Sequence, residues 1–266
     1  MFNPIQAWRG FLERENDDRV KVYGVAILVA FVCAIVISTA SVTLRPMQNA
    51  HLEAERQARM DAMLDRLPSM RTIMEDAGVD ALETRLVDLA SGEFVTDIDP
   101  DSYDVQAALN DPEQSVAIPP ELDVAGLQKR APYAPVYLLQ SEGALLLVVL
   151  PVSGVGYQST LRAMLALEAD MTTVAALTII EQGETAGLGA RIEEPDWQAQ
   201  WQGKQVFDEA GAIVIQVVRG QADGPYEVDG ISGASRTGNG VTNMVRYWLG
   251  DHGFGPFLSR LQKEGL

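Results

Sequence analysis

The stretch from Tyr23 to Leu44 constrains the chain most, because its 22 residues carry no charged side chain. About 20 apolar residues cross the hydrocarbon core of a bilayer as a helix, so the stretch predicts a single N-terminal transmembrane helix over residues 23–44. The alternatives are a cleaved signal peptide and a helix buried in a globular core. A signal peptide usually has a shorter apolar run behind a short basic segment, whereas residues 1–22 come first here.

The distribution of charge argues against a nucleic-acid partner and predicts how the chain is oriented in the membrane. With 20 basic and 37 acidic residues the formal net charge is −17. We expect no nucleic-acid partner, because phosphate backbones are bound by clustered Lys and Arg. Residues 1–22 are net neutral, and their basic residues slightly outnumber those just after the apolar run. This bias predicts a cytoplasmic segment 1–22 and a periplasmic C-terminal domain, held by one span in a bacterial inner membrane.

Few residues of the chain are suited to bind a transition metal. Cys33 is the one cysteine, which excludes an intramolecular disulfide and a thiolate cluster. The two histidines, His51 and His252, lie far apart in the sequence. We therefore expect no metal site of the zinc type.

The part after the apolar run divides at about residue 136. Residues 45–135 predict a helical stalk followed by an irregular connection, because 46–90 is rich in Ala, Arg, Met, Glu and Leu, whereas 95–135 is rich in Asp and Pro. Residues 136–266 predict the folded domain. Apolar runs there indicate antiparallel strands, with helices between and after them, so the fold class is α+β.

The expected elements of this domain follow from hydrophobic periodicity. Trp197, Trp201 and Trp248 fall on helical faces, where we expect them to pack in the core. Gly250 is expected to close the last helix. The expected strands are 136–140, 144–150, 161–168, 172–180 and 212–218, and the expected helices are 195–202 and 239–249.

The segment 229–237, DGISGASRT, predicts a phosphate attachment point. Its small residues let a backbone approach a ligand closely, and its hydroxyls stand just before a predicted helix. A helix N-terminus has free N–H groups and the positive end of the dipole, so it favours a phosphate. The alternative is a helix entry capped by Asp229 or Ser232. That alternative explains one hydroxyl, but not Ser232, Ser235 and Thr237 together.

A second loop, Glu181–Gly189, also has the composition of a binding segment. Three glycines and a threonine in EQGETAGLG give a backbone that can lie against a flat ligand and offer N–H donors. The loop lacks the Walker and dinucleotide fingerprints. An ordinary surface turn is the alternative.

These segments resemble a known family. The stretch 229–235 resembles the motif at which a flavin transferase attaches FMN, through its phosphate, to a hydroxyl side chain. Glu181–Lys204 and Tyr247–Leu258, together with the single span, resemble the C subunit of the sodium-translocating NADH:quinone oxidoreductase. The G subunit of the Rnf complex shares the acceptor motif but resembles the flanking stretches less.

The resemblance implies a membrane-anchored flavoprotein that relays electrons inside a complex of six subunits and is not catalytic alone. It implies a covalent FMN phosphoester at Ser235, although the usual motif has threonine at this position; Thr237 is the alternative acceptor. Asp229 would help to position the flavin phosphate, or would cap the turn. Gly154, Gly156 and Tyr157 are expected as a further wall of the site, with packing in the core as the alternative for Tyr157. The other expected FMN contacts are Glu184, Thr185, Gly187, Leu188, Gly189, Ser232, Gly233 and Ala234.

Three other functions remain open from the sequence. The chain could be an electron-transport subunit of the Rnf type. It could be a membrane-anchored redox sensor that binds FMN, although residues 1–22 hold no output domain. It could also be a scaffold that has lost its flavin, for which the serine at position 235 is the one indication.

Overall fold

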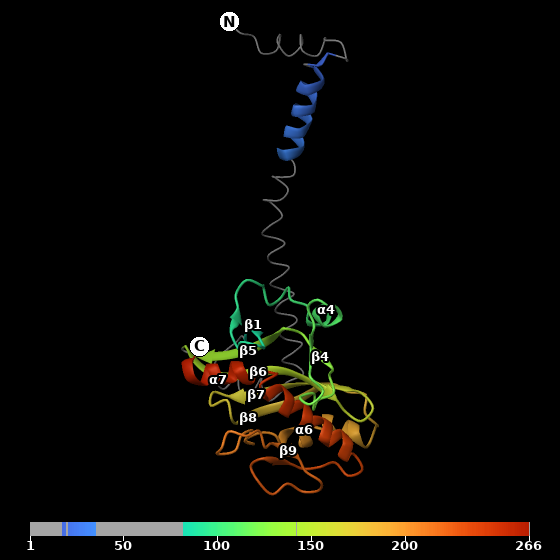
Figure 1. Ribbon diagram of the computed structural model, residues 1–266, viewed down its shortest axis with the longest axis vertical. Coiled ribbons are helices and arrows are strands. Elements are labelled where there is room, and N and C mark those ends of the chain that lie inside the picture. Colours follow the sequence, from blue (N-terminus) through green and yellow to red (C-terminus); the bar gives the residue numbers. More distant parts are fainter. Residues whose placement is uncertain (1–17, 20, 36–81, 142, 266) are drawn as a thin grey trace. The chain divides into compact units, whose positions relative to one another are not determined.

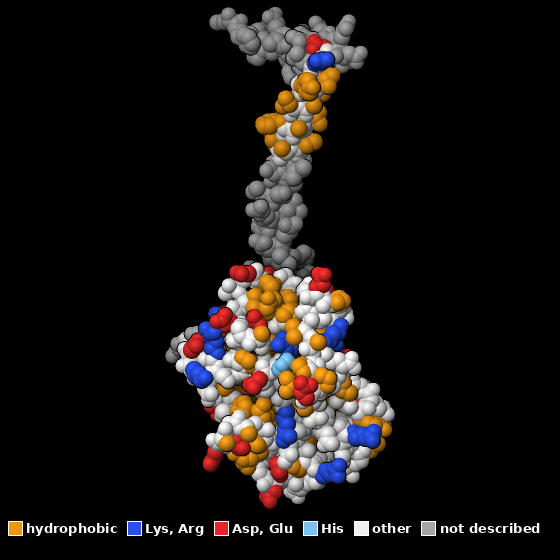
Figure 2. All heavy atoms as spheres, in the orientation of Figure 1, with side chains coloured by type: hydrophobic (Ala, Val, Ile, Leu, Met, Phe, Trp, Pro, Cys, Tyr) orange, Lys and Arg blue, Asp and Glu red, His pale blue; other side chains and the backbone are white. Residues whose placement is uncertain are grey.

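The structure, a computed structural model, describes residues 18, 19, 21–35, 82–141 and 143–265. The chain forms two compact units, Met1–Arg59 and Met60–Leu266. In the first unit, residues 21–35 are helical and their apolar side chains are mostly exposed (Figure 2). Within the described ranges, no helix has both the length and the apolar character needed to cross a membrane. Residues 36–44 of the predicted span and 45–81 of the predicted stalk lie outside the described residues.

A six-stranded antiparallel sheet organises the second unit, in the order β2-β1-β5-β6-β7-β8 (Figure 1). The antiparallel α+β domain is confirmed: the strands expected at 136–140 and 144–150 pair as β5 and β6, and those expected at 161–168 and 172–180 pair as β7 and β8. The strands of this sheet are β1 (Glu83–Asp88), β2 (Phe94–Val95), β5 (Tyr133–Ser141), β6 (Ala144–Val155), β7 (Thr160–Glu168) and β8 (Val174–Glu181).

Both faces of the central strands are buried, which explains their nearly continuous apolar sequence. Val148, Leu150 and Val152 of β6 belong to the larger core cluster, which also contains helical side chains. Leu147 and Val149 alternate with them and belong to a smaller cluster on the opposite face.

Helices and short strands surround this sheet. α6 (Ser235–Leu249) packs on β6, and α7 (Gly255–Glu264) follows it (Figure 1). Trp197, Trp201 and Trp248 are all buried in the larger cluster, as predicted. The remaining elements are α4 (Val105–Asn110), β3 (Val116–Ala117), β4 (Lys129–Arg130), the 3-10 helix η1 (Gly189–Glu193), α5 (Pro195–Ala199), β9 (Gln216–Val217) and β10 (Glu227–Val228).

The structure corrects the sequence prediction before residue 136. Glu83–Asp88 is strand β1 rather than part of a helix, because it pairs along its length with β5. The helix-forming composition of 46–90 is a weak preference that tertiary pairing overrides here. The expected boundary at 136 falls inside β5 (Tyr133–Ser141), so the sheet extends further towards the N-terminus than predicted.

Two later elements also differ from the prediction in length. The strand expected at 212–218 is reduced to β9 (Gln216–Val217). The helix expected at 239–249 begins at Ser235, and Gly250 ends it by donating its N–H to the carbonyls of Arg246 and Tyr247. The earlier start places the whole hydroxyl-rich end of the motif inside the first turn of α6.

Candidate functional site

Three segments that are distant in sequence meet at one corner of the sheet. They are the β6–β7 turn at 156–159, the loop 182–188 after β8, and the stretch 230–237 that leads into α6. The carboxylate of Glu184 joins all three. Its Oε2 accepts a 2.6 Å hydrogen bond from Thr237 Oγ1, and its Oε1 accepts 3.0 Å bonds from Gln158 N and Ser159 Oγ. The N–H groups of Tyr157 and Ser159 also donate to this carboxylate, each at 3.1 Å.

Glu184 is therefore a buried anion with its own set of donors. The residue is 7% exposed. Burial alone would raise the pKa of Glu184, but hydrogen bonds from Thr237 and from the 157–159 turn stabilise the charged form and bring the pKa below its ordinary value. The carboxyl group is thus ionised at neutral pH, and it faces the protein interior.

Glycines make this close approach possible. A Cβ at Gly189 would lie 2.5 Å from Thr237 Oγ1, and one at Gly156 would lie 2.6 Å from Glu184 Oε1. A Cβ at Gly240 would lie 2.9 Å from the Cα of Gly156, so the backbone of α6 lies directly against the turn. Larger side chains at these positions would separate the three segments.

The acceptor motif divides into exposed and buried residues. Ser235 is the first residue of α6 and is exposed, as are Ser232 and Gly233, whereas Ala234 is buried. Gly233 has a φ of +78°, which favours glycine, and a Cβ there would lie 3.1 Å from Leu188 Cδ2. Thr237 is 2% exposed and donates its hydroxyl to Glu184. The two hydroxyls considered as acceptors thus lie in opposite environments.

The N-terminus of α6 lacks a cap from any described side chain, and its first two residues are exposed. Ala234 stands at the capping position, and among the described residues no side chain forms a capping hydrogen bond there. The capping by Asp229 or Ser232 that the sequence left open is therefore wrong. The guanidinium of Arg236 adds a positive charge beside Ser235, and its Cζ lies 5.2 Å from the centre of the Tyr157 ring.

Asp229 is half-buried and shapes the preceding loop. Its Oδ1 accepts a 2.6 Å hydrogen bond from Ala222 N, and its backbone is bonded to the side chains of Trp197 and Gln200. Among the described residues, no group of three or more His, Cys, Asp or Glu side chains is placed to hold a metal ion.

Apolar side chains are exposed around the same corner. Tyr157 is 53% exposed, Val155 47% and Leu188 43%. The loop of residues 122–126 adjoins them, since Val155 N donates to Ala125 O at 2.8 Å. Exposed apolar side chains beside an open helix N-terminus suit a ligand with an apolar ring system and a phosphate.

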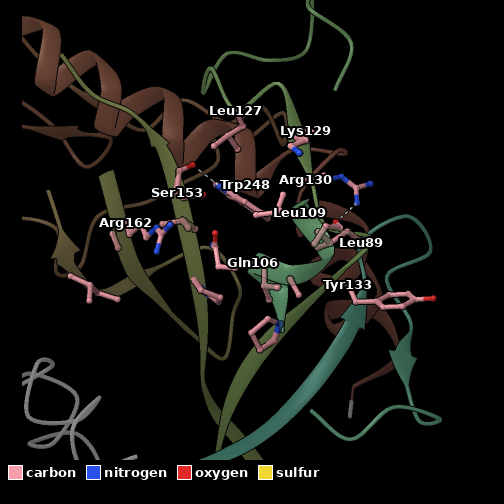
Figure 3. A pocket seen from close by; sticks show the side chains of 18 residues that line it. Leu89, Gln106, Leu109, Leu127, Lys129, Arg130, Tyr133, Ser153, Arg162 and Trp248 are labelled. Atoms are coloured by element: carbon pink, nitrogen blue, oxygen red, sulfur yellow. Dashed lines mark hydrogen bonds between the residues drawn. The ribbon is translucent and has the colours of Figure 1, made fainter. Parts of the chain in front are cut away.

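A separate cavity of about 250 Å³ lies near the other end of α6 (Figure 3). Its lining is largely apolar and comes from α4, β4 and the sheet. Trp248 borders it and donates its Nε1 to Ser153 O at 2.7 Å. Trp248 lies 13 positions after Ser235 on α6, about 20 Å along the axis, so this cavity does not belong to the corner with the open helix end.

Comparison with known proteins assigns the chain to a family whose matching region contains this corner. The FMN-binding domain family matches residues 156–250, a range that begins at the β6–β7 turn and ends with α6, and so contains all three segments. The C subunit of the Na(+)-translocating NADH-quinone reductase from Yersinia pestis is 38% identical over 95% of this chain and 97% of its own. The chain belongs to this family of C subunits. The resemblance seen in the sequence is confirmed.

Two further relatives agree. The C subunit of the same reductase from Vibrio alginolyticus is 41% identical over 94% of this chain and 98% of its own length. The crystal structure of NqrC from Shewanella oneidensis matches with a TM-score of 0.67 at 30% identity, covering 75% of this chain and 98% of that one. The antiparallel α+β fold of the family is therefore shared with an experimentally determined structure.

Sequence reasoning missed the inward role of Glu184 and its partner Ser159. Glu184 was expected among the flavin contacts, but its carboxylate binds protein donors from two other segments. Arg236 was also missed. Thr237 lies 53 positions after Glu184, and one sequence has no signal that pairs them.

Proposed function

We propose that this chain binds FMN at the corner described above and relays electrons within a Na(+)-translocating NADH-quinone reductase. Its membership of the C subunit family over nearly the whole chain supports this function, and so does the FMN-binding domain match. Bound FMN supplies the redox chemistry, whereas the protein supplies binding, orientation and electrostatics. As one part of an oxidoreductase complex, the chain is not catalytic alone.

The FMN phosphate is linked as an ester to Ser235. The observation that carries this proposal is that Ser235 is an exposed residue at the N-terminus of the 15-residue helix α6, which no described side chain caps. The free N–H groups and the helix dipole stabilise a phosphodiester there, and Arg236 adds charge complementarity. Serine offers the same nucleophilic oxygen as the threonine of the usual motif. It lacks only the methyl group that restricts the threonine rotamer.

Thr237 is the alternative acceptor, and its surroundings count against it. At 2% exposure its hydroxyl is out of reach of a modifying enzyme, and it already donates to Glu184. Esterification would place a phosphate against a buried carboxylate. Such burial of like charges is strongly unfavourable.

The isoalloxazine ring lies against the loop 184–189. Thr185, Gly187, Leu188 and Gly189 provide backbone groups and the exposed Leu188 side chain, which adjoins Gly233. Tyr157 and Gly156 form the second wall, and Ser232, Gly233 and Ala234 leave room for the phosphate. Asp229 helps the transferase to position that phosphate, and its bond from Ala222 also keeps the preceding loop in shape.

Attachment requires a flavin transferase and an activated flavin donor. The Ser235 oxygen forms a bond to the phosphorus on the flavin side of a flavin dinucleotide, the bond between the two phosphates breaks, and the other nucleotide leaves. The hydroxyl proton goes to a base of the transferase. A covalent link keeps the flavin from being lost in the periplasm, where we propose that this domain lies.

The anchoring follows from the sequence. Residues 1–22 are proposed to be cytoplasmic and 23–44 to span the inner membrane once, with the C-terminal domain periplasmic, on the length of the uncharged run and the distribution of basic residues. The partners are the other five members of a complex of six subunits.

Intact-mass measurement of the full chain, co-expressed with its flavin transferase, tests the attachment. The wild-type chain and Thr237→Ser should each gain the mass of one FMN less one water. Ser235→Ala should lose the adduct completely, and Ser235→Thr should retain it. A wild-type mass equal to the bare polypeptide, or an adduct that survives in Ser235→Ala, would overturn the proposal.

The partner proposal is tested on the purified membrane complex. The chain should co-purify with the other subunits, and the Ser235→Ala complex should assemble but lose nearly all NADH-driven quinone reduction. A chain that purifies from the membrane without other subunits contradicts the assignment.

A further inference from the structure

The carboxylate of Glu184 has no capacity left for a ligand. Five donor groups converge on it: the N–H groups of residues 157, 158 and 159, the Ser159 hydroxyl and the Thr237 hydroxyl. An ionised carboxylate has two oxygens with about four lone-pair sites in total. The donors of the protein therefore saturate it, and a flavin ring N–H would have to displace one of them.

The same donors explain why a charge is needed at this position. Three successive backbone N–H groups of the β6–β7 turn point at one spot, and a buried N–H without a partner is costly. A single anion satisfies all three. The donors in turn offset the cost of burying the charge, so the turn and the carboxylate depend on each other.

The geometry links this anion to the proposed acceptor. Thr237 is two residues after Ser235 on α6, and its 2.6 Å bond to Glu184 fixes the first turn of the helix. Glu184 itself lies in the loop proposed to contact the ring. Ser159 strengthens the junction, since its Oγ accepts from Gly183 N at 2.8 Å and donates to Glu184 at 3.0 Å.

We propose that Glu184 is a positioning residue of the flavin site: its buried carboxylate locks the ring-contact loop, the β6–β7 turn and the first turn of α6 in one relative arrangement. This inference rests on the proposed FMN attachment at Ser235. Glu184 acts by holding Thr237 and the turn in place. It does not itself contact the reacting flavin atoms, which are contacted by the loop backbone. It also keeps a fixed negative charge in the proposed flavin site, which would oppose the gain of electrons by the ring.

Glu184→Gln in the flavinylated full chain is the direct test, because glutamine is nearly isosteric but neutral. Two readouts separate positioning from mere stability: the visible circular dichroism of the flavin and its midpoint potential. The dichroism band should weaken. At a fixed applied potential the ratio of reduced to oxidised flavin should rise about tenfold, because a unit negative charge in the site is removed. That change is about 30 mV for a two-electron couple.

Matched variants make the result specific. Glu181→Gln removes a carboxylate three residues away that is exposed and paired with Arg162 at 3.2 Å, and it should leave both readouts at the wild-type values. Thr237→Val deletes one donor and should weaken the dichroism band, whereas Thr237→Ser keeps the hydroxyl and should preserve it.

The outcomes distinguish this inference from the proposed function. Flavinylated Glu184→Gln with unchanged dichroism and potential overturns the positioning role and leaves the attachment at Ser235 intact. If Glu184→Gln does not fold, an unchanged dichroism band in Thr237→Val overturns it instead. A wild-type chain without a flavin adduct overturns the proposed function itself.

Discussion

The two ends of α6 differ in the residues that they contain and in the contacts that hold them in place. At the N-terminal end Ser235 is exposed, and Gly238 and Gly240 let the helix backbone approach its neighbours closely. At the C-terminal end Tyr247 and Trp248 are buried and contact each other at 5.5 Å between ring centres. One end depends on hydrogen bonds to a buried charge, and the other on apolar contact. A single helix thus joins a ligand site to the rigid core that holds it in place.

The largest effect should come from removing aromatic packing at the C-terminal end. Trp248→Ala deletes a buried ring that contacts Phe254 at 5.3 Å and leaves Ser153 O without its indole donor. We expect a loss of about 3–5 kcal/mol in the free energy of unfolding. Urea denaturation measures it, and the fraction that remains folded should still carry flavin on Ser235.

Trp248→Phe serves as the control for this prediction, since it keeps an aromatic ring and removes the indole N–H. It should cost less than the alanine variant. A Trp248→Ala chain as stable as the wild type would show that the C-terminal end does not support the domain, and the contrast between the two ends would fail.

The C-terminal end could be predicted from the sequence because its signal is local. Trp248 falls on the apolar stripe of one helix, and its burial follows from the helical period alone. The exposed Ser235 was also found locally, since a run of small and hydroxylated residues is visible without a structure.

The N-terminal end could be predicted only in part. Gly238 is a poor helix former and the apolar periodicity begins only at Val241, so the helix was expected to start at residue 239 rather than at Ser235. Glycine occurs at helical positions 238 and 240 because a larger side chain would collide with Val217 and Gly156, and the contacts made there hold the helix together despite its glycines. These contacts bring distant parts of the chain together, as do β1 with β5 and Glu184 with Thr237. Such pairs leave no trace in the spacing of one sequence.

Adding a methyl group at the N-terminal end should have an intermediate effect. In Gly240→Ala the new Cβ would lie 2.8 Å from Val155 O and 2.9 Å from Gly156 Cα, which are backbone atoms that cannot turn aside. We expect a loss of about 1–3 kcal/mol in unfolding free energy. Because the β6–β7 turn must move, flavin attachment should also fall, as measured by intact mass.

Gly224→Ala is the matched control. No atom lies within 4 Å of a Cβ at this position, and its backbone is not in the left-handed region. Its stability should equal that of the wild type or exceed it by about 0.4–1 kcal/mol, because alanine restricts the unfolded chain. Equal losses in the two variants would mean that close approach at Gly240 is not what the glycine provides.

Acid should weaken the N-terminal end. The pKa of Glu184 lies below its ordinary value of 4.5 in the folded chain, so the unfolded state binds the proton more readily. The stability given by this carboxylate is present above about pH 4.5 and is lost as the pH falls through the lower folded value. Urea midpoints measured from pH 7 downward should therefore decline less in Glu184→Gln than in the wild type.

Alkali should weaken the C-terminal end. Burial raises the pKa of Tyr247 from 10.0 to about 12, with the nearby Arg130 guanidinium opposing the rise. Between these values the folded state keeps a proton that the unfolded state has lost, so the stability present below pH 10 decreases as the pH rises. We expect a loss of about 1–3 kcal/mol, since one pKa unit corresponds to about 1.4 kcal/mol. Tyr247→Phe should remove this alkaline loss and leave the acid loss unchanged, whereas Glu184→Gln should do the reverse. If either variant removed both the acid and the alkaline loss of unfolding free energy, the two ends of α6 would have to be treated as one coupled unit.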